Sequence, residues 1–230
     1  MYTPYDWQEG IGNRAQYIEG KLSQGSPVFA VSREDGILVF TFRRQGRKIY
    51  EIYDRLIYAG IGQQSDVEAV RVAALEFASK EGYNRSEADV TIQRVATSMS
   101  APLKRAFSDF SASPLVARSL FAEVNDTPGE DLYYKLDYDG DYTMSRNRSV
   151  VAGTQEVTDS ALAELDKLDR STGTVEEMSD ALREIWLKVM NPEGHHSTEE
   201  VTAGLTPEAV LLERSNAREN RFRLLTAEEF

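Results

Sequence analysis

The stretch SPVFAVSREDGILVFTFRRQGRKIYEIYDRLIYAGIGQ, residues 26–63, carries the strongest strand pattern of this 230-residue chain. Residues 28–31 and 37–42 are two apolar runs rich in β-branched and aromatic side chains, and the sequence REDG separates them. Gly36 has no Cβ and can adopt a positive φ, so an Asp-Gly turn between two such runs predicts a β-hairpin.

A second hairpin is predicted directly after the first. Residues 49–53 and 56–61 are again rich in Ile, Tyr and Leu, and Asp54-Arg55 lies between them. Aliphatic residues fall on both faces of the strand expected at 37–42, which is typical of a sheet that is covered on both sides. We therefore expect helices to pack on the sheets.

The rest of the chain supplies those helices and further strands. Apolar residues spaced three and four apart predict helices over 5–23, 65–81, 87–107 and 154–168, and a capping box of Thr174 with Glu177 begins another. Gly82 is expected to end the second helix. Strands are predicted at 114–123, 132–136, 141–144 and 149–151. This order predicts an α+β fold, a four-layer αββα sandwich of the Ntn-hydrolase class with an N-terminal helix before the first strand.

No linker rich in Pro, Gly or Ser interrupts the chain before residue 191, so residues 1–190 are expected to form one domain. From Asn191 onward the sequence is polar and acidic. We expect 191–230 to be a C-terminal tail, which could contain a short helix at 209–216. The apolar stripe of the first helix could pack on its own domain or on a neighbouring subunit.

The composition excludes several classes of function. A formal charge of -12 and a pI near 4.8 argue against nucleic-acid binding, because phosphates require a basic surface. The absence of cysteine excludes disulfides, thiolate metal sites and a cysteine nucleophile. No apolar run reaches the roughly 20 residues of a membrane helix, and no export signal is recognisable, so we expect a cytoplasmic protein that does not contact a membrane. His195-His196 has no third ligand at metal-site spacing, and no phosphate-binding loop occurs; we expect neither metal nor cofactor.

Several motifs resemble those of proteasome subunits. Gly25-Ser26, Asp35-Gly36 and Lys48-Ile49 fall where that family carries its opening strands. The sequences KIYEIYDR (48–55), GYNRSEADVT (82–91), VVAGTQEV (150–157) and DALR (180–183) look most like the bacterial α-type subunit. The resemblance covers about residues 14–190.

The resemblance implies a non-catalytic α-type subunit, in which a retained helix precedes the first strand. It implies a homo-heptameric ring that gates access to a ring of proteasome β-type peptidase subunits and docks an AAA-type ATPase activator. The gate residues would be Met1, Tyr2, Thr3, Pro4, Tyr5 and Asp6. Lys48, Gly62 and Gln63 would bind the C-terminal carboxylate of the activator. The local sequence alone, without the resemblance, would instead indicate that Lys48 is a solvated lysine at the end of a strand.

The alternative is a catalytically active Ntn hydrolase. Such enzymes use the first residue of the processed chain as nucleophile, which would make Ser26 the nucleophile and Lys48 its neighbouring cation. Three features oppose this alternative. Phe42 occupies the position of the expected acidic partner, Pro27 follows Ser26, and residues 1–25 read as a helix with an apolar face of its own. A ring without an ATPase, or a stand-alone binding domain, also remains open.

Overall fold

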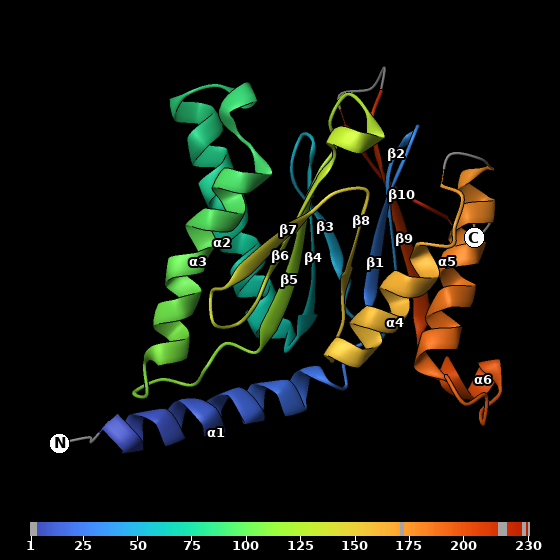
Figure 1. The fold of residues 1–230 in the computed structure, drawn as a ribbon. Coiled ribbons are helices and arrows are strands. Elements are labelled where there is room, and N and C mark those ends of the chain that lie inside the picture. Colours follow the sequence, from blue (N-terminus) through green and yellow to red (C-terminus); the bar gives the residue numbers. More distant parts are fainter. Residues whose placement is uncertain (1–3, 171–172, 216–219, 227–228, 230) are drawn as a thin grey trace.

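Two five-stranded antiparallel sheets, stacked face to face, form the centre of the molecule (Figure 1). The computed structural model describes residues 4–170, 173–215, 220–226 and 229. Sheet A contains, in spatial order, β10 (Phe222–Leu224), β9 (Thr206–Glu213), β2 (Gly36–Arg43), β1 (Val28–Arg33) and β8 (Arg148–Val151). Sheet B contains β3 (Ile49–Tyr53), β4 (Leu56–Gly62), β5 (Ala117–Glu123), β6 (Leu132–Leu136) and β7 (Tyr142–Ser145).

Both predicted hairpins are present, and each starts a different sheet. β1 pairs with β2 in sheet A, and β3 pairs with β4 in sheet B. Gly36 has a φ of +151°, and a Cβ at this position would lie 2.1 Å from the carbonyl oxygen of Leu212. The turn therefore requires glycine both for its backbone conformation and for the close approach of β9.

Four helices cover the outer faces of the two sheets, as expected. α2 (Gln64–Asn84) and α3 (Ile92–Ser108) pack on sheet B, and α4 (Gln155–Leu165) and α5 (Val175–Met190) pack on sheet A. One hydrophobic cluster lies between the sheets, and one lies between each sheet and its helices. This arrangement confirms the α+β fold class and the four-layer αββα sandwich.

Two helix boundaries differ from the prediction. α2 continues through Gly82 to Asn84. Gly82 leaves room for the hydroxyl of Tyr53 beside the helix, since a Cβ there would lie 2.1 Å from that oxygen. The helix predicted over 87–107 divides into a short 3-10 turn, η1 (Glu87–Asp89), and α3. Thr91 caps α3 by accepting a hydrogen bond from the Arg94 amide, which sets the start of the helix.

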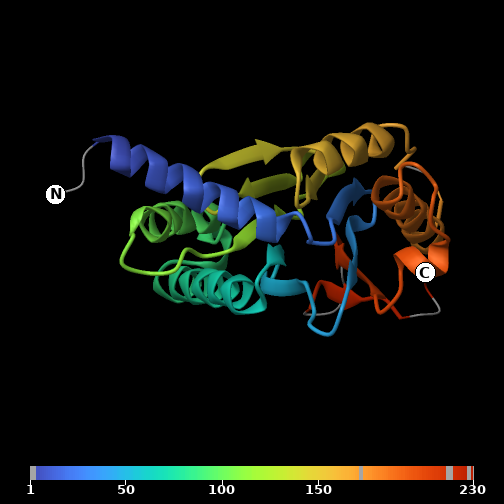
Figure 2. The same cartoon turned by 90° about the horizontal axis from the view of Figure 1, so that it is seen from below.

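α1 (Pro4–Leu22) confirms the predicted N-terminal helix and crosses one end of the sandwich (Figure 2). Its last turns pack on the domain itself, where Ile18 and Leu22 are fully buried in the cluster between the sheets. Its first turns extend past α3. Trp7 in this part is half exposed, and its ring packs on Phe110 with the ring centroids 5.0 Å apart. The apolar stripe of the helix is thus divided between the core and the surface.

A buried arginine joins α1 to the strands. Arg118 of β5 makes ion pairs with Glu19 of α1 at 2.8 Å and with Asp137 at 3.0 Å. It also donates a hydrogen bond to the carbonyl of Ala152 at 2.9 Å. Because these partners belong to separate segments, one side chain fixes α1 to both sheets.

The prediction of a polar tail with a helix at 209–216 is wrong for the described part of that segment. Residues 206–213 form β9, which pairs with β2 along its whole length and places Ala209, Val210 and Leu212 in the core. A short run of apolar residues is compatible with a buried strand as well as with a helix. The strand forms here because β2 has an edge with which residues 206–213 can pair. Asn216 lies outside the described residues. Residues 191–204 contain a single helical turn, α6 (Thr198–Val201), which Ser197 and Glu200 cap.

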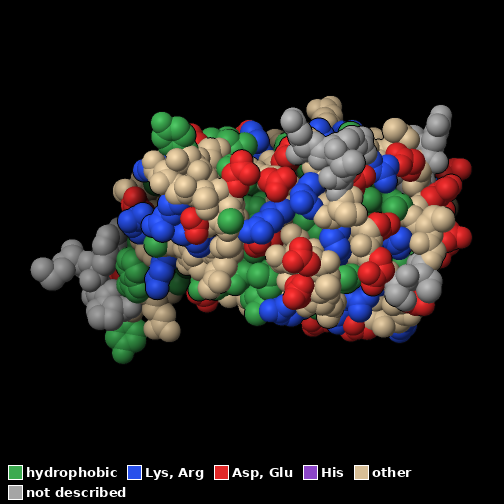
Figure 3. Space-filling view, turned by 90° about the horizontal axis from the view of Figure 1, so that it is seen from above, with side chains coloured by type: hydrophobic (Ala, Val, Ile, Leu, Met, Phe, Trp, Pro, Cys, Tyr) green, Lys and Arg blue, Asp and Glu red, His purple; other side chains and the backbone are tan. Residues whose placement is uncertain are grey.

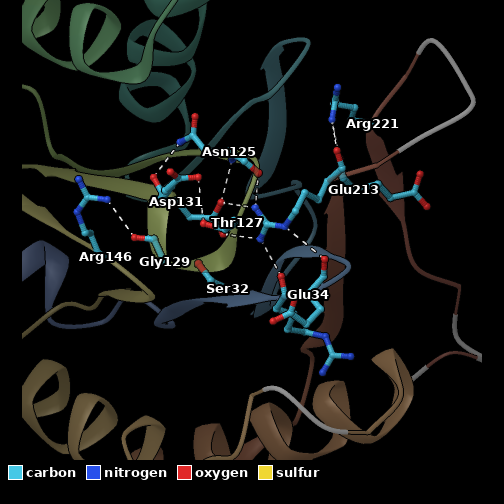
Figure 4. A network of polar contacts seen from close by, with 12 residues as sticks. Ser32, Glu34, Asn125, Thr127, Gly129, Asp131, Arg146, Glu213 and Arg221 are labelled. Atoms are coloured by element: carbon cyan, nitrogen blue, oxygen red, sulfur yellow. Dashed lines mark hydrogen bonds and ion pairs between the residues drawn. The ribbon is translucent and has the colours of Figure 1, made fainter.

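A second arginine closes the opposite end of the sandwich (Figure 4). Arg214, which follows β9, makes two hydrogen bonds to the buried carboxylate of Asp131, at 2.7 and 2.9 Å. The same guanidinium donates to the carbonyl groups of Arg33 and Glu34 in the β1–β2 turn. Arg214 therefore ties the end of sheet A to the loop between β5 and β6 of sheet B.

The position of β9 predicts the stability of two variants. Leu212→Ala should lower the free energy of unfolding by about 2–5 kcal/mol, because Leu212 is fully buried between the sheets. Leu224→Ala on β10 is the matched control, since this leucine is 48% exposed, and it should cost less than about 0.5 kcal/mol. Urea unfolding followed by circular dichroism measures both. Equal effects of the two substitutions would contradict the role of β9 in the core.

Candidate functional site

A groove of about 530 Å³ opens where α1 meets the first strand. The loop between β2 and β3, the ends of β4 and α5, and the segment around α6 form its walls. Its lining contains three cations and not one Asp or Glu among the described residues: Lys21, Gln24, Gly25, Ser26, Phe42, Arg44, Gly46, Lys48, Ile61, Gly62, Gln63, Gln64, Trp186, Met190, Val201, Ala203 and Leu205. One side of the groove is cationic, and the side formed by α5 and α6 is apolar.

Lys48 lies at the bottom of this groove, one residue before β3. Its ammonium donates a hydrogen bond to the carbonyl oxygen of Ser26 at 2.8 Å, and its backbone amide donates to a carboxylate oxygen of Glu208 at 2.9 Å. Burial lowers the pKa of Lys48 to about 8; the negative charge of Glu208 opposes this decrease, and the positive charge of Arg44 adds to it.

No carboxylate neutralises this ammonium directly. Among the residues that the structure describes, no Asp or Glu oxygen lies within 4.0 Å of the Lys48 Nζ. Glu208 is engaged elsewhere, because it accepts from the Lys48 amide and lies within 4.0 Å of the guanidinium groups of Arg43 and Arg47. The groove thus presents a partly desolvated cation that an incoming anion can pair with.

Gly62 and Gln63 line the same groove beside Lys48, so the structure brings together the three residues that the sequence suggested for activator binding. Gly62 has a φ of +133°, and a Cβ would lie 2.0 Å from the carbonyl oxygen of Val116. Gln63 precedes the first turn of α2, and its amide donates to that same carbonyl. The close approach of Val116 explains why glycine is required here.

Ser26, the nucleophile of the alternative interpretation, also lines the groove. Lys48 donates a hydrogen bond to the carbonyl oxygen of Ser26, and the Oγ accepts a hydrogen bond from the indole of Trp186 at 3.2 Å. Phe42 packs on Trp186 with the ring centroids 4.4 Å apart. Ser26 is therefore held through both its carbonyl oxygen and its hydroxyl.

Two residues of the site were missed by the sequence analysis. Trp186 follows Leu182 by four residues on the inward face of α5, and this periodicity could have placed it at the core. Glu208 directly precedes the helix that the sequence suggested at 209–216, and the sequence Thr-Pro-Glu suits a first helical turn, so nothing local singles Glu208 out as a site residue. Its contact with the Lys48 backbone spans 160 positions, and no local pattern indicates it.

The suggested gate residues lie far from the groove along α1. Met1, Tyr2 and Thr3 fall outside the described residues, and Pro4 begins the helix. Tyr5 and Asp6 are exposed in its first turn. A 19-residue helix is about 28 Å long, and Lys48 contacts Ser26 just beyond the C-terminal end of α1. Tyr5 and Asp6, at the N-terminal end, are therefore separated from Lys48 by most of the length of the helix.

The groove at the opposite end of the molecule has a different character. Arg55, Arg146, Arg214 and Arg221 line it together with Asp126 and Glu130. Arg55 pairs with Glu123, Arg214 with Asp131 and Arg221 with Asp54. Figure 3 shows this end, where acidic side chains lie among the basic ones. The positive charge there is largely neutralised.

Among the described residues, no group of three or more His, Asp or Glu side chains is arranged so that it could hold a metal ion. His195 pairs with Glu193 at 3.0 Å, and both side chains are exposed. None of the described helices is both long and apolar enough to cross a membrane.

Comparison with known proteins places this fold in a family. The sequence model described as "Proteasome subunit" matches residues 22–202. A proteasome subunit alpha from Jonesia denitrificans is 30% identical over 225 residues, which is 96% of this chain and 91% of that protein. The one from Actinosynnema mirum is 33% identical over 67% of this chain and 59% of its own length, and the one from Streptomyces avermitilis is 26% identical over 100% and 89%. The chain therefore belongs to the proteasome subunit family, as a member of the bacterial α type.

Proposed function

We propose that this chain is a non-catalytic subunit of a proteasome core particle, which forms a homo-heptameric ring in the cytoplasm and controls the access of substrates to a ring of β-type peptidase subunits. An AAA-type ATPase activator docks on this ring through its C-terminal carboxylate. The observation that supports the docking site most directly is the groove at Lys48, which is cationic in a chain with a net charge of -12.

A carboxylate is the group that suits this groove best. Within the described residues the Lys48 ammonium has no carboxylate partner of its own, and Arg44 and Lys21 add positive charge to the groove. An exposed pair of a lysine and a carboxylate contributes only about 0–1 kcal/mol, whereas a partly buried, charge-assisted hydrogen bond contributes about 1.5–3 kcal/mol. Trp186, Met190 and Leu205 on the opposite wall accommodate the apolar side chains that precede the carboxylate.

The packing of α1 supports a role without catalysis. Ile18 and Leu22 are part of the core between the sheets, and Glu19 pairs with Arg118. Removing residues 1–25 would expose this apolar surface and would leave Arg118 with one ion pair fewer. A segment that is integrated in this way is unsuited to removal as a propeptide. In the proposed ring, Met1 to Asp6 lie near the axial pore and restrict passage.

The first prediction from the proposed function concerns Lys48. In the core particle assembled with its β-type subunit, Lys48→Ala should leave the ring intact by sedimentation and should weaken binding of the activator by about 10- to 100-fold, because one charge-assisted hydrogen bond is lost. Activator-stimulated degradation of a protein substrate should fall accordingly. Lys80→Ala on the exposed side of α2 is the control, and it should change neither quantity. Normal stimulation by the Lys48→Ala particle would contradict the assignment.

The pKa of Lys48 also predicts how the affinity for the activator depends on pH. Docking requires the ammonium, so affinity should be nearly complete at pH 7 and should decrease through pH 8, to about one tenth at pH 9 of the value at pH 7. Lys48→Arg keeps its charge over this range and should lack the decrease. Equal pH dependence in the two proteins would assign the effect to another group.

The second prediction concerns the gate. Deleting Met1 to Asp6 should raise the rate at which the assembled particle hydrolyses short peptides without activator, because access to the peptidase ring is no longer restricted. A fluorogenic peptide assay measures this rate. The particle that carries only Tyr5→Ala is the control for local damage to α1. An unchanged rate in the deletion variant would exclude these residues from the gate.

The third prediction separates the proposed function from the alternative Ntn hydrolase with Ser26 as nucleophile. The intact mass of the chain, purified after co-expression with its β-type subunit, should include residues 1–25. A chain that begins at Ser26 would instead show that it is processed as a peptidase. Ser26→Ala should have no effect on peptide hydrolysis by the particle if the β-type subunits carry all of the activity.

A further inference from the structure

Lys48 has the surroundings of a reactive amine. With a pKa of about 8, about one fifth of this side chain is neutral at pH 7.4, against about one in a thousand for an ordinary lysine. A desolvated lysine beside another cation is a known way to obtain a nucleophilic amine. The charged groups that face it are Glu208 of β9, Arg44 of the β2–β3 loop and Lys21 of α1.

The geometry leaves the amine free to react. Its hydrogen bond to the Ser26 carbonyl uses one N–H, so the lone pair of the neutral amine is not engaged by that contact. No carboxylate pairs with it in the described part of the chain, and it lies in an open groove of about 530 Å³. Small molecules can therefore reach the nitrogen atom.

The lining of the groove selects the kind of reagent. Lys21 and Arg44 attract anions, and no acidic side chain among the described lining residues repels them. Acyl phosphates combine a negative charge with a small activated acyl group. Three other lysines differ in their surroundings: Lys167 and Lys188 pair with Glu164, and Lys80 is exposed and lies outside the groove.

We propose that Lys48 is a modification site, acylated by anionic acyl donors of the acyl phosphate class. The neutral amine attacks the carbonyl carbon of the donor, and a C–N bond forms as the C–O bond to phosphate breaks. Phosphate leaves with the electron pair of that bond, and the proton lost by the nitrogen passes to phosphate or water. The product is an amide of Lys48 without a positive charge.

Acylation has a consequence that rests on the proposed function. The amide cannot form an ion pair with a carboxylate, and its acyl group adds bulk to a side chain that lines the groove. Modified subunits would therefore no longer dock an activator, and a metabolite that carries an activated acyl group would lower activator-dependent degradation.

The fourth prediction tests the modification itself. The purified full-length chain is incubated with acetyl phosphate at pH 7.4, and peptide mass spectrometry follows acetylation at each lysine over time. Lys48 should be modified at least fivefold faster than Lys80 of the same molecules, because far more of its side chain is neutral. A rate at Lys48 equal to or below that at Lys80 would overturn the proposal.

A variant and a second reagent test the preference for anions. Lys21→Gln removes one rim charge without changing Lys48, and it should lower the rate at Lys48 with acetyl phosphate at least twofold relative to the rate with a neutral acetyl ester. An unchanged ratio would overturn the restriction to anionic donors.

Because mass is measured without an activator, this experiment can succeed even if the docking function is wrong. Binding of the activator to the acetylated particle then tests the consequence separately.

Discussion

The closure of one end of the stacked sheets by α1 is the constraint on which the rest of the molecule depends. Two sheets packed face to face leave an apolar interior that must be covered at its ends. Ile18 and Leu22 complete this interior, and Arg118 fixes the helix by pairing with Glu19. Because the pair is partly buried, its contribution depends on both partners remaining in place, and loss of one would leave a buried charge.

Ser26 lies shortly after α1, in the same groove as Lys48. Its hydroxyl accepts a hydrogen bond from Trp186, and its carbonyl oxygen accepts one from the Lys48 ammonium. In the proposed function this pair of residues supplies a cation and a backbone acceptor, and does not supply a nucleophile and its base. The proposed docking and acylation both depend on that role of Lys48.

The distribution of charge distinguishes the two ends of the sandwich. At the end far from α1, Arg214 and Asp131 form a buried pair that holds the sheets together. At the α1 end, the carboxylate of Glu208 is shared between Arg43, Arg47 and the backbone of Lys48. The Lys48 ammonium donates to the carbonyl oxygen of Ser26, and no carboxylate among the described residues forms an ion pair with it. Similar residue types therefore form a neutralised pair at one end and line a cationic groove at the other.

The sequence by itself determined the two hairpins and the covering helices, because these features depend on turn chemistry and periodicity within short windows. The grouping of Lys48, Gly62 and Gln63 came from the resemblance to the proteasome family. Only the tertiary structure decided that residues 206–213 form a strand, that Trp186 holds Ser26, and that Glu208 lies against Lys48. The physical reason is that each depends on a partner about 160 or more positions away, and an apolar or acidic residue carries no local sign of which distant surface it will contact.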